Sequence, residues 1–195
     1  MRKFDLIKLI IPAVILVSSC QTGERKTGET SSQDTIANDT IGVEQLSAIA
    51  TIEPASGSRV TGTASFEQAG EGVKMTVNLQ NVPPGKHGFH VHEKGDCSAK
   101  DAASAGGHWN PTGKKHGQRG VTEEYHRGDL ATNLEAGEDS TINYETTISD
   151  WTIGGPDSTN IVGKSLILHA MADDFKSQPS GNSGPRIGCG VIKKK

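Results

Sequence analysis

Short segments in which apolar and polar residues alternate limit the fold of this chain more than any other feature. Residues 73–79 (VKMTVNL) alternate in this way, as a β-strand does when one of its faces lies on a core. This segment ends at turn residues 81–85. Further strand candidates, separated by glycine-rich or polar connections, are residues 60–66, 88–92, 140–148, 165–170 and 187–192. Several short strands predict an all-β sandwich or barrel.

The composition favours the same class. A chain of 195 residues has room for one core with extensions at its ends. Its 24 glycines and 4% aromatic residues, with 33% hydrophobic residues, indicate tight turns and small side chains rather than long amphipathic helices. The formal net charge is −3, and the basic residues are scattered apart from residues 193–195. We therefore expect no nucleic-acid partner.

The first twenty residues (MRKFDLIKLIIPAVILVSSC) predict export. A basic start is followed by an apolar stretch around Leu9 to Val17, which is too short to span a bilayer comfortably, and then by two serines. Residues 1–19 are therefore interpreted as a signal peptide. The sequence Val-Ser-Ser-Cys resembles the lipobox of bacterial lipoproteins, which implies that Cys20 carries lipid and anchors the mature chain to a membrane. The alternative is a plain signal peptide cut near Cys20.

Residues 20–47 are expected to comprise the lipidated cysteine and a flexible polar tether, because residues 21–46 are polar, lack aromatic residues and show no apolar period. Residues 48–195 would form the folded domain. Three cysteines in an exported protein would leave one thiol unpaired. Assigning Cys20 to lipid leaves Cys97 and Cys189 to form one disulfide, which is stable in an oxidising compartment. The sequence does not distinguish the inner membrane, the periplasmic face of an outer membrane and the cell surface.

Two long stretches without periodicity, residues 93–129 and 172–185, are expected to be functional loops. Five histidines fall within residues 90–126. His90 and His92 are two apart on a predicted strand, so both rings should project from one face while their neighbours pack on the other. This pair alone also fits two histidines on a wet sheet face.

The loop histidines strengthen the case for metal binding. His108, His116, His126 and Asp129 together form a normal tetrahedral zinc set. Copper is suited by several imidazoles in a tetragonal arrangement. A second site for copper could therefore be supplied by His90, His92 and the distant His169.

In these stretches the sequence is similar to the copper/zinc superoxide dismutase family, over about residues 48–193, and it resembles the exported lipoprotein-type bacterial members. The matching stretches are GFHVHEKGDC (88–97), SAGGHWNP (104–111), KHG (115–117), HRGDL (126–130), LHAMADD (168–174) and GNSGPRIGCGV (181–191). The resemblance implies a Greek-key β-sandwich or flattened barrel, the immunoglobulin-like architecture of that family.

The resemblance also implies a role for each motif residue. His90, His92 and His169 match copper ligands, and His116, His126 and Asp129 match zinc ligands. His108 matches the histidine whose deprotonated ring bridges both ions. Other matched positions are Asp173, which orients one copper-ligand and one zinc-ligand imidazole, Arg186, which holds the anionic substrate, His87, which braces the backbone without binding metal, and the disulfide pair Cys97 and Cys189.

The implied activity is dismutation of superoxide to oxygen and hydrogen peroxide by copper redox cycling, which would protect the cell envelope. An alternative is an envelope copper chaperone or metal buffer on the same fold, and another is a metal-free adhesion sandwich. The complete ligand set and Arg186 argue against both. Residues 174–184 are short, with Lys176 as their only cation, and residues 96–106 are longer than in the intracellular members. Steering residues other than Arg186, and a homodimer, therefore stay open.

Overall fold

The computed structural model describes residues 45–195. The predicted signal peptide, Cys20 and almost all of the predicted tether lie outside this range. Within it, no helix is both long and apolar enough to cross a bilayer.

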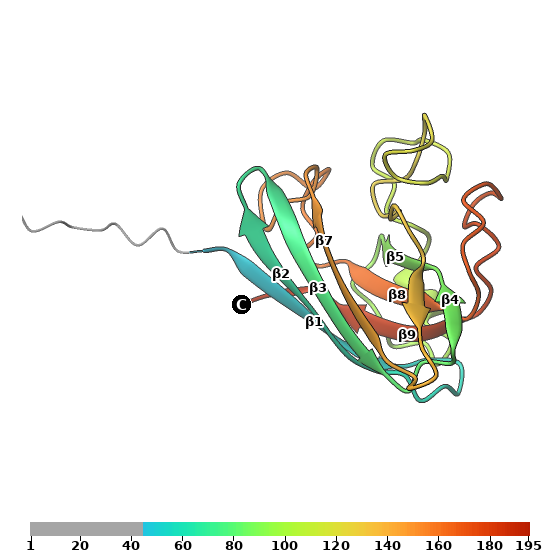
Figure 1. The fold of residues 1–195 in the computed structure, drawn as a ribbon. Helices are drawn as coiled ribbons and strands as arrows, with labels where there is room; N and C mark the ends of the chain where they lie inside the picture. Colours follow the sequence, from blue (N-terminus) through green and yellow to red (C-terminus); the bar gives the residue numbers. More distant parts are fainter. Residues whose placement is uncertain (1–44) are drawn as a thin grey trace, which may run out of the picture. The chain divides into compact units, whose positions relative to one another are not determined.

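Regular structure in residues 45–195 consists of short strands and one 3-10 turn, Ala103–Ala105 (Figure 1). The strands are β1 (Ser47–Pro54), β2 (Thr61–Ala69), β3 (Gly72–Gln80), β4 (Gly85–His87), β5 (Phe89–His92), β6 (Leu134–Ala136), β7 (Ile142–Ile148), β8 (Ser165–His169), β9 (Arg186–Val191) and β10 (Lys193–Lys194). The predicted all-β class is confirmed.

Most strands belong to one curled antiparallel sheet with the order β5-β8-β9-β1-β2-β3-β7 (Figure 1). Strand β1 joins the two halves of this sheet, because it pairs with β2 along Ser47–Ile52 and with β9 only at Glu53 and Pro54. Strand β10 extends the pairing of β1, and β4 pairs with β6 as a separate small sheet. Strand β7 follows β4, β5 and β6 in the chain but pairs with β3, which precedes them. This long connection agrees with the predicted Greek-key architecture, and the curled sheet forms a half-barrel.

The six predicted strands are all present, with ends shifted by at most three residues. Four strands were not predicted. In β1 the buried positions include Ala48 and Ala50, which are small and weakly strand-forming. Strands β4 and β6 have three residues each, and β10 consists of two exposed lysines. Strands this short are defined by pairing with other strands, and they contain too few residues for an alternation of apolar and polar side chains to be detected.

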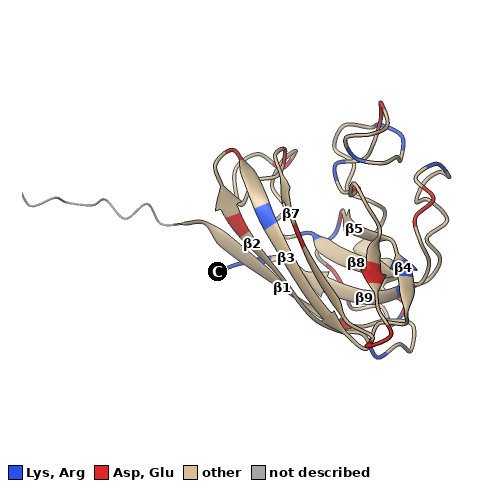
Figure 2. Cartoon of the chain, in the orientation of Figure 1, with Lys and Arg blue, Asp and Glu red and all other residues tan. Residues whose placement is uncertain are grey.

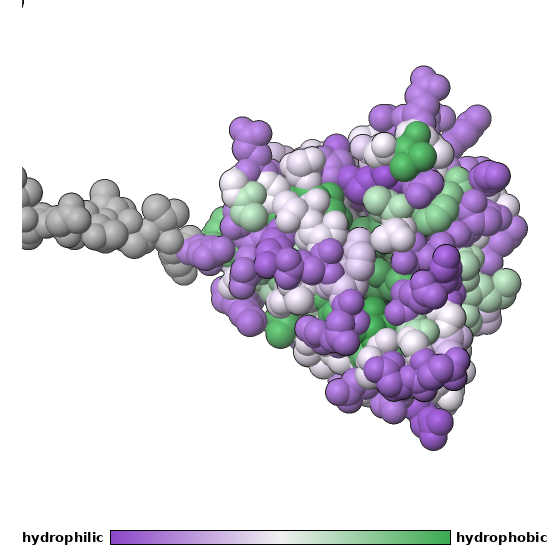
Figure 3. All heavy atoms as spheres, in the orientation of Figure 1, coloured by the Kyte–Doolittle hydropathy of each residue, from purple (hydrophilic) through white to green (hydrophobic). Residues whose placement is uncertain are grey.

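Apolar side chains from most of the strands form one core. In β3 the alternation places Val73, Met75, Val77 and Leu79 in the interior, each 0–1% exposed, as the sequence pattern predicted. They join a single large apolar cluster that contains Phe66 and other buried side chains. Polar side chains cover most of the face drawn in Figure 3.

The predicted Cys97–Cys189 disulfide is confirmed, with its cysteines 92 residues apart in the sequence. It fastens the beginning of the loop between β5 and β6 (residues 93–133) to strand β9. A small apolar cluster surrounds it, formed by Ala55, Ala102, Ala105 and Ile167. The second long loop (residues 170–185) connects β8 to β9. These two loops carry most of the candidate site.

Candidate metal centre

Strand β5 contributes two buried histidines. His90 and His92 are each 1% exposed, and the residues that alternate with them, Phe89 and Val91, belong to the apolar core cluster. Because successive side chains point to opposite faces of a strand, both imidazoles lie on the face opposite this cluster.

His169 approaches the same place from the end of β8, the strand that pairs with β5. The pairing of β8 with β9 is irregular between Leu168 and His169. The ring of His169 lies 5.1 Å from that of His90 and 5.7 Å from that of His92, between centroids. Three imidazoles from two neighbouring strands therefore meet.

The loop of residues 93–133 returns to β5 through a short backbone ladder. The Trp109 N–H donates to the Val91 carbonyl, the Val91 N–H donates to the Gly128 carbonyl, and the Gly128 N–H donates to the Trp109 carbonyl, at 2.8–3.0 Å. A Cβ atom on Gly128 would collide with the Val91 carbonyl oxygen, so glycine is required for this approach. His108 precedes Trp109 in the chain and Asp129 follows Gly128, so the ladder places both residues beside β5.

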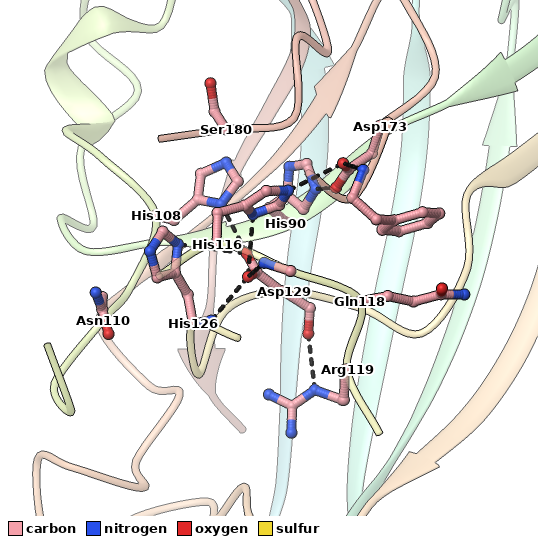
Figure 4. Close-up of polar contacts among 12 residues, drawn as sticks. His90, His108, Asn110, His116, Gln118, Arg119, His126, Asp129, Asp173 and Ser180 are labelled. Atoms are coloured by element: carbon pink, nitrogen blue, oxygen red, sulfur yellow. Dashed lines mark hydrogen bonds and ion pairs between the residues drawn. The ribbon is translucent and has the colours of Figure 1, made fainter. Parts of the chain in front are cut away.

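The predicted ligands form two groups with one shared member. Figure 4 labels five of these ligands, His90, His108, His116, His126 and Asp129. Within each group, the atoms available for a metal ion lie within 4.8 Å of one another. The first group consists of His90, His92, His108 and His169, and the second of His108, His116, His126 and Asp129. All seven residues are buried, and His108 belongs to both groups.

One ring nitrogen of each histidine in these groups is buried and makes no hydrogen bond, although two of these atoms, Nδ1 of His116 and of His126, lie 3.0 and 3.5 Å from the Asp129 carboxylate. These atoms are His90 Nδ1, His92 Nε2, His108 Nε2, His116 Nδ1, His126 Nδ1 and His169 Nε2. An unpaired buried polar atom costs about 1–3 kcal/mol. A metal ion would satisfy several such nitrogens at once, so the donor set fits two metal ions. Three imidazoles with one carboxylate suit zinc, and a set of imidazoles alone suits copper.

In all of these histidines except His126, the opposite ring nitrogen has a protein partner that fixes the ring. His90 Nε2 lies 2.7 Å from one oxygen of Asp173, and His116 Nε2 lies 3.0 Å from the other. The backbone carbonyls of Gly106 and Gly184 accept from His92 Nδ1 and His169 Nδ1 at 2.9 and 3.1 Å. Asp173 therefore links one ring of each group, and such outer contacts set ring orientation and tautomer.

Asn133 holds Asp173 in turn. Its Oδ1 accepts the Asp173 N–H at 2.7 Å, and its Nδ2 donates to the Asp173 carbonyl at 3.0 Å. No sequence pattern predicts this contact, because the two residues are 40 positions apart and a single asparagine in a polar loop has no distinguishing spacing.

Burial keeps several of the imidazoles neutral. Burial, reinforced by the neighbouring His90 ring, lowers the pKa of His108 to about 4 and that of His169 to about 3. Burial, followed by electrostatic repulsion from the neighbouring His108 ring, also lowers the pKa of His92 well below its usual value. A neutral imidazole is the form that binds metal.

His116 behaves in the opposite way because it lies between two carboxylates. Burial lowers the pKa of His116, but the close contacts with the Asp129 and Asp173 carboxylates outweigh this effect and raise it to about 9. Burial alone would raise the pKa values of Asp129 and Asp173. Contacts with the surrounding histidines outweigh burial, so both pKa values lie well below their usual range. In the metal-free protein at pH 7, the His116 ring therefore carries a proton that a bound metal ion would replace.

Arg186 lies at the wall of a cavity of about 450 Å³ that reaches both groups. The cavity is lined by His92, Gly107, His108, Asn110, His126, His169, Pro179, Ser180, Gly184 and Arg186. The guanidinium donates to the carbonyls of Ala102 and Gly106 at 2.6 and 2.7 Å. Burial lowers the pKa of Arg186. The usual pKa of a guanidinium is so high that the group stays charged.

His87 belongs to neither group. Its two ring nitrogens each lie 2.8 Å from a backbone carbonyl oxygen, that of His169 for Nδ1 and that of Pro83 for Nε2. The side chain therefore spans the backbone at the end of β8 and the turn before β4.

The sequence model of the family described as copper/zinc superoxide dismutase (SODC) matches residues 60–192. The match includes every residue of the two groups, together with Asp173, Arg186 and both cysteines of the disulfide.

Zinc(II) binding to the metal-free protein is expected to depend on pH through His116. At pH 7 this residue is protonated, because its pKa is about 9, and each bound ion must displace that proton. Zinc affinity should therefore rise about tenfold per pH unit from pH 7 to about 8.5. Titration against a zinc buffer measures this slope. Asp173→Asn loses one of the two carboxylates that raise the pKa of His116. In this variant, zinc affinity should therefore stop rising at a lower pH than in the wild type. A wild-type affinity that stays constant over this range would contradict the assignment.

Proposed function

The chain belongs to the copper/zinc superoxide dismutase family, and from this premise we propose that it converts two superoxide anions and two protons to oxygen and hydrogen peroxide. The observation that carries the proposal is the convergence of six buried ring nitrogens and one buried carboxylate on two groups that share His108. The cavity beside Arg186 gives a small anion access to the first group.

We assign copper to the group of His90, His92, His108 and His169, and zinc to the group of His108, His116, His126 and Asp129. Bound copper would supply one-electron redox chemistry, and bound zinc would supply a fixed positive charge without redox chemistry. The residues of the chain do the remaining work of binding, orientation and proton transfer.

His108 is proposed to manage the proton. Its Nδ1 faces Asp129 at 2.8 Å, and its buried Nε2 faces the first group. The cavity is lined in part by this ring. When Nε2 does not bind metal it can hold a proton and donate it to the reduced product.

Arg186 is proposed to bind the anionic substrate. The Ala102 and Gly106 carbonyls hold its guanidinium at the cavity wall. A guanidinium makes charge-assisted hydrogen bonds to a small anion. Both long loops carry charges of both signs (Figure 2), and the net charge of the chain is −3. Attraction of the substrate to this cavity therefore depends on local cations such as Arg186.

A copper chaperone or metal buffer remains the second candidate function. It would need the ligand groups but no anion-binding group in the cavity. The fixed guanidinium of Arg186 favours catalysis over storage.

The full-length protein loaded with copper and zinc is expected to consume superoxide. Arg186→Ala should keep both metals, and its rate of superoxide consumption should fall about 10- to 100-fold. A loss of this size corresponds to one hydrogen bond to a charged group. His108→Ala should lose most activity. Arg59→Ala, which removes an equal charge from an exposed position away from the cavity, serves as the control. Metal analysis with a superoxide-consumption assay gives both readouts. Full copper binding without superoxide consumption in the wild type would favour the chaperone.

We further propose that the protein is exported and held to a membrane of the cell envelope by lipid on Cys20, as in bacterial lipoproteins. Three features support this proposal: the basic and apolar start, the Val-Ser-Ser-Cys sequence, and a disulfide of the kind found in oxidising compartments. In that position, the enzyme would protect the envelope from superoxide.

Replacing Cys20 tests the anchor separately from catalysis. In cells fed a labelled fatty acid, the wild-type protein should carry label and sediment with membranes. Cys20→Ser should lose both properties while keeping its dismutase activity, because position 20 lies outside the family-matched residues 60–192. A Cys20→Ser protein that still carries the fatty-acid label would contradict the proposal.

A further inference from the structure

The two long loops meet at the second metal group through side chains. Among the described residues, no backbone-to-backbone hydrogen bond connects residues 93–133 with residues 170–185. The loops are joined instead by the contacts of Asp173 with His116 and Asn133, and by a glutamine that the catalytic account does not use.

That glutamine is Gln178. Its Oε1 accepts the His116 N–H at 2.9 Å, and its Nε2 donates to the His116 carbonyl at 3.0 Å. The same Nε2 also donates to the Lys176 carbonyl at 3.2 Å. One side-chain amide therefore pairs with both backbone polar groups of a single residue, as a neighbouring strand would.

His116 depends on this pairing for its backbone. The residue is buried, in a stretch of loop without regular secondary structure. Within residues 45–195, its N–H and its carbonyl have no hydrogen-bond partner other than Gln178. Buried backbone groups are almost always paired, and an unpaired one is costly.

The loop that carries Gln178 is itself held in shape. Asp174 accepts hydrogen bonds from the backbone N–H groups of Lys176 and Ser177 at 2.9 and 2.8 Å. Gly181 has a positive φ of 65°, and a Cβ atom there would collide with Asp173 and lie 2.7 Å from His116 Nε2. The backbone of this loop therefore lies directly on the pair formed by Asp173 and His116.

We infer that Gln178 is a positioning residue of the zinc group, which fixes the backbone of His116 so that its Nδ1 faces Asp129 and the other ligands. This inference rests on the zinc assignment proposed above. Gln178 is itself an exposed residue, so its replacement removes little buried apolar surface. A change in zinc binding would therefore come from the lost amide contacts rather than from lost packing.

The test compares Gln178→Ala with Gln118→Ala in the full-length, metal-loaded protein. Gln118 lies on the same ligand loop and donates to the Ala131 carbonyl at 2.8 Å, so the control also loses an amide contact but leaves the His116 backbone paired. Contacts that orient ligands typically contribute 10- to 100-fold to metal affinity. Gln178→Ala should therefore lose zinc to a chelator about 10- to 100-fold faster than Gln118→Ala, with copper retention unchanged.

Cobalt(II) in place of zinc supplies a second readout, because its visible bands depend on ligand geometry. The bands should shift in Gln178→Ala and not in Gln118→Ala. Equal zinc loss and equal cobalt spectra in the two variants would overturn the inference. A wild-type protein that binds both metals without consuming superoxide would refute the proposed function and leave this inference standing. A wild-type protein that binds neither zinc nor cobalt would refute both.

Discussion

The carboxylate of Asp129 is the group on which the rest of the site depends. It is fully buried, and its oxygens lie 2.8, 3.0 and 3.5 Å from the ring nitrogens of His108, His116 and His126. The backbone N–H groups of His126 and Gly117 also donate to it. A buried charge requires a partner of opposite sign. In the metal-free protein that partner is the His116 imidazolium, and in the loaded protein it would be a cation bound by the same atoms.

The fold meets this requirement by dividing the work between strands and loops. Regular pairing with β8 sets the positions of His90 and His92 on β5, and His169 follows directly at the irregular end of β8. The remaining ligands come from a loop, which the Cys97–Cys189 disulfide fastens at one end and the backbone ladder holds to β5 further along. Asp173 then ties one ring of each group together. The site is thus positioned by strand pairing where the sheet reaches it and by side-chain contacts elsewhere.

Local sequence patterns could predict only part of this arrangement. Strand alternation identified the His90–His92 pair and the β3 core face, and family motifs gave the division of the ligands. The alanine-rich β1 and the very short β4 and β6 left no period to read. Asn133 and Gln178 could not be found from the sequence, because each holds the backbone of a residue 40 or 62 positions away. Contacts of that kind exist only after the loops have folded together.

The central claim is that one imidazole, that of His108, belongs to two metal sites. Electron paramagnetic resonance of the protein with copper(II) in the first group and cobalt(II) in the second tests it most directly. A ring bound through both nitrogens couples the unpaired electrons of the two ions, so the copper(II) signal should be strongly weakened. With zinc, which has no unpaired electron, the signal should be complete. A copper(II) signal of equal intensity in the two forms would contradict the shared ligand.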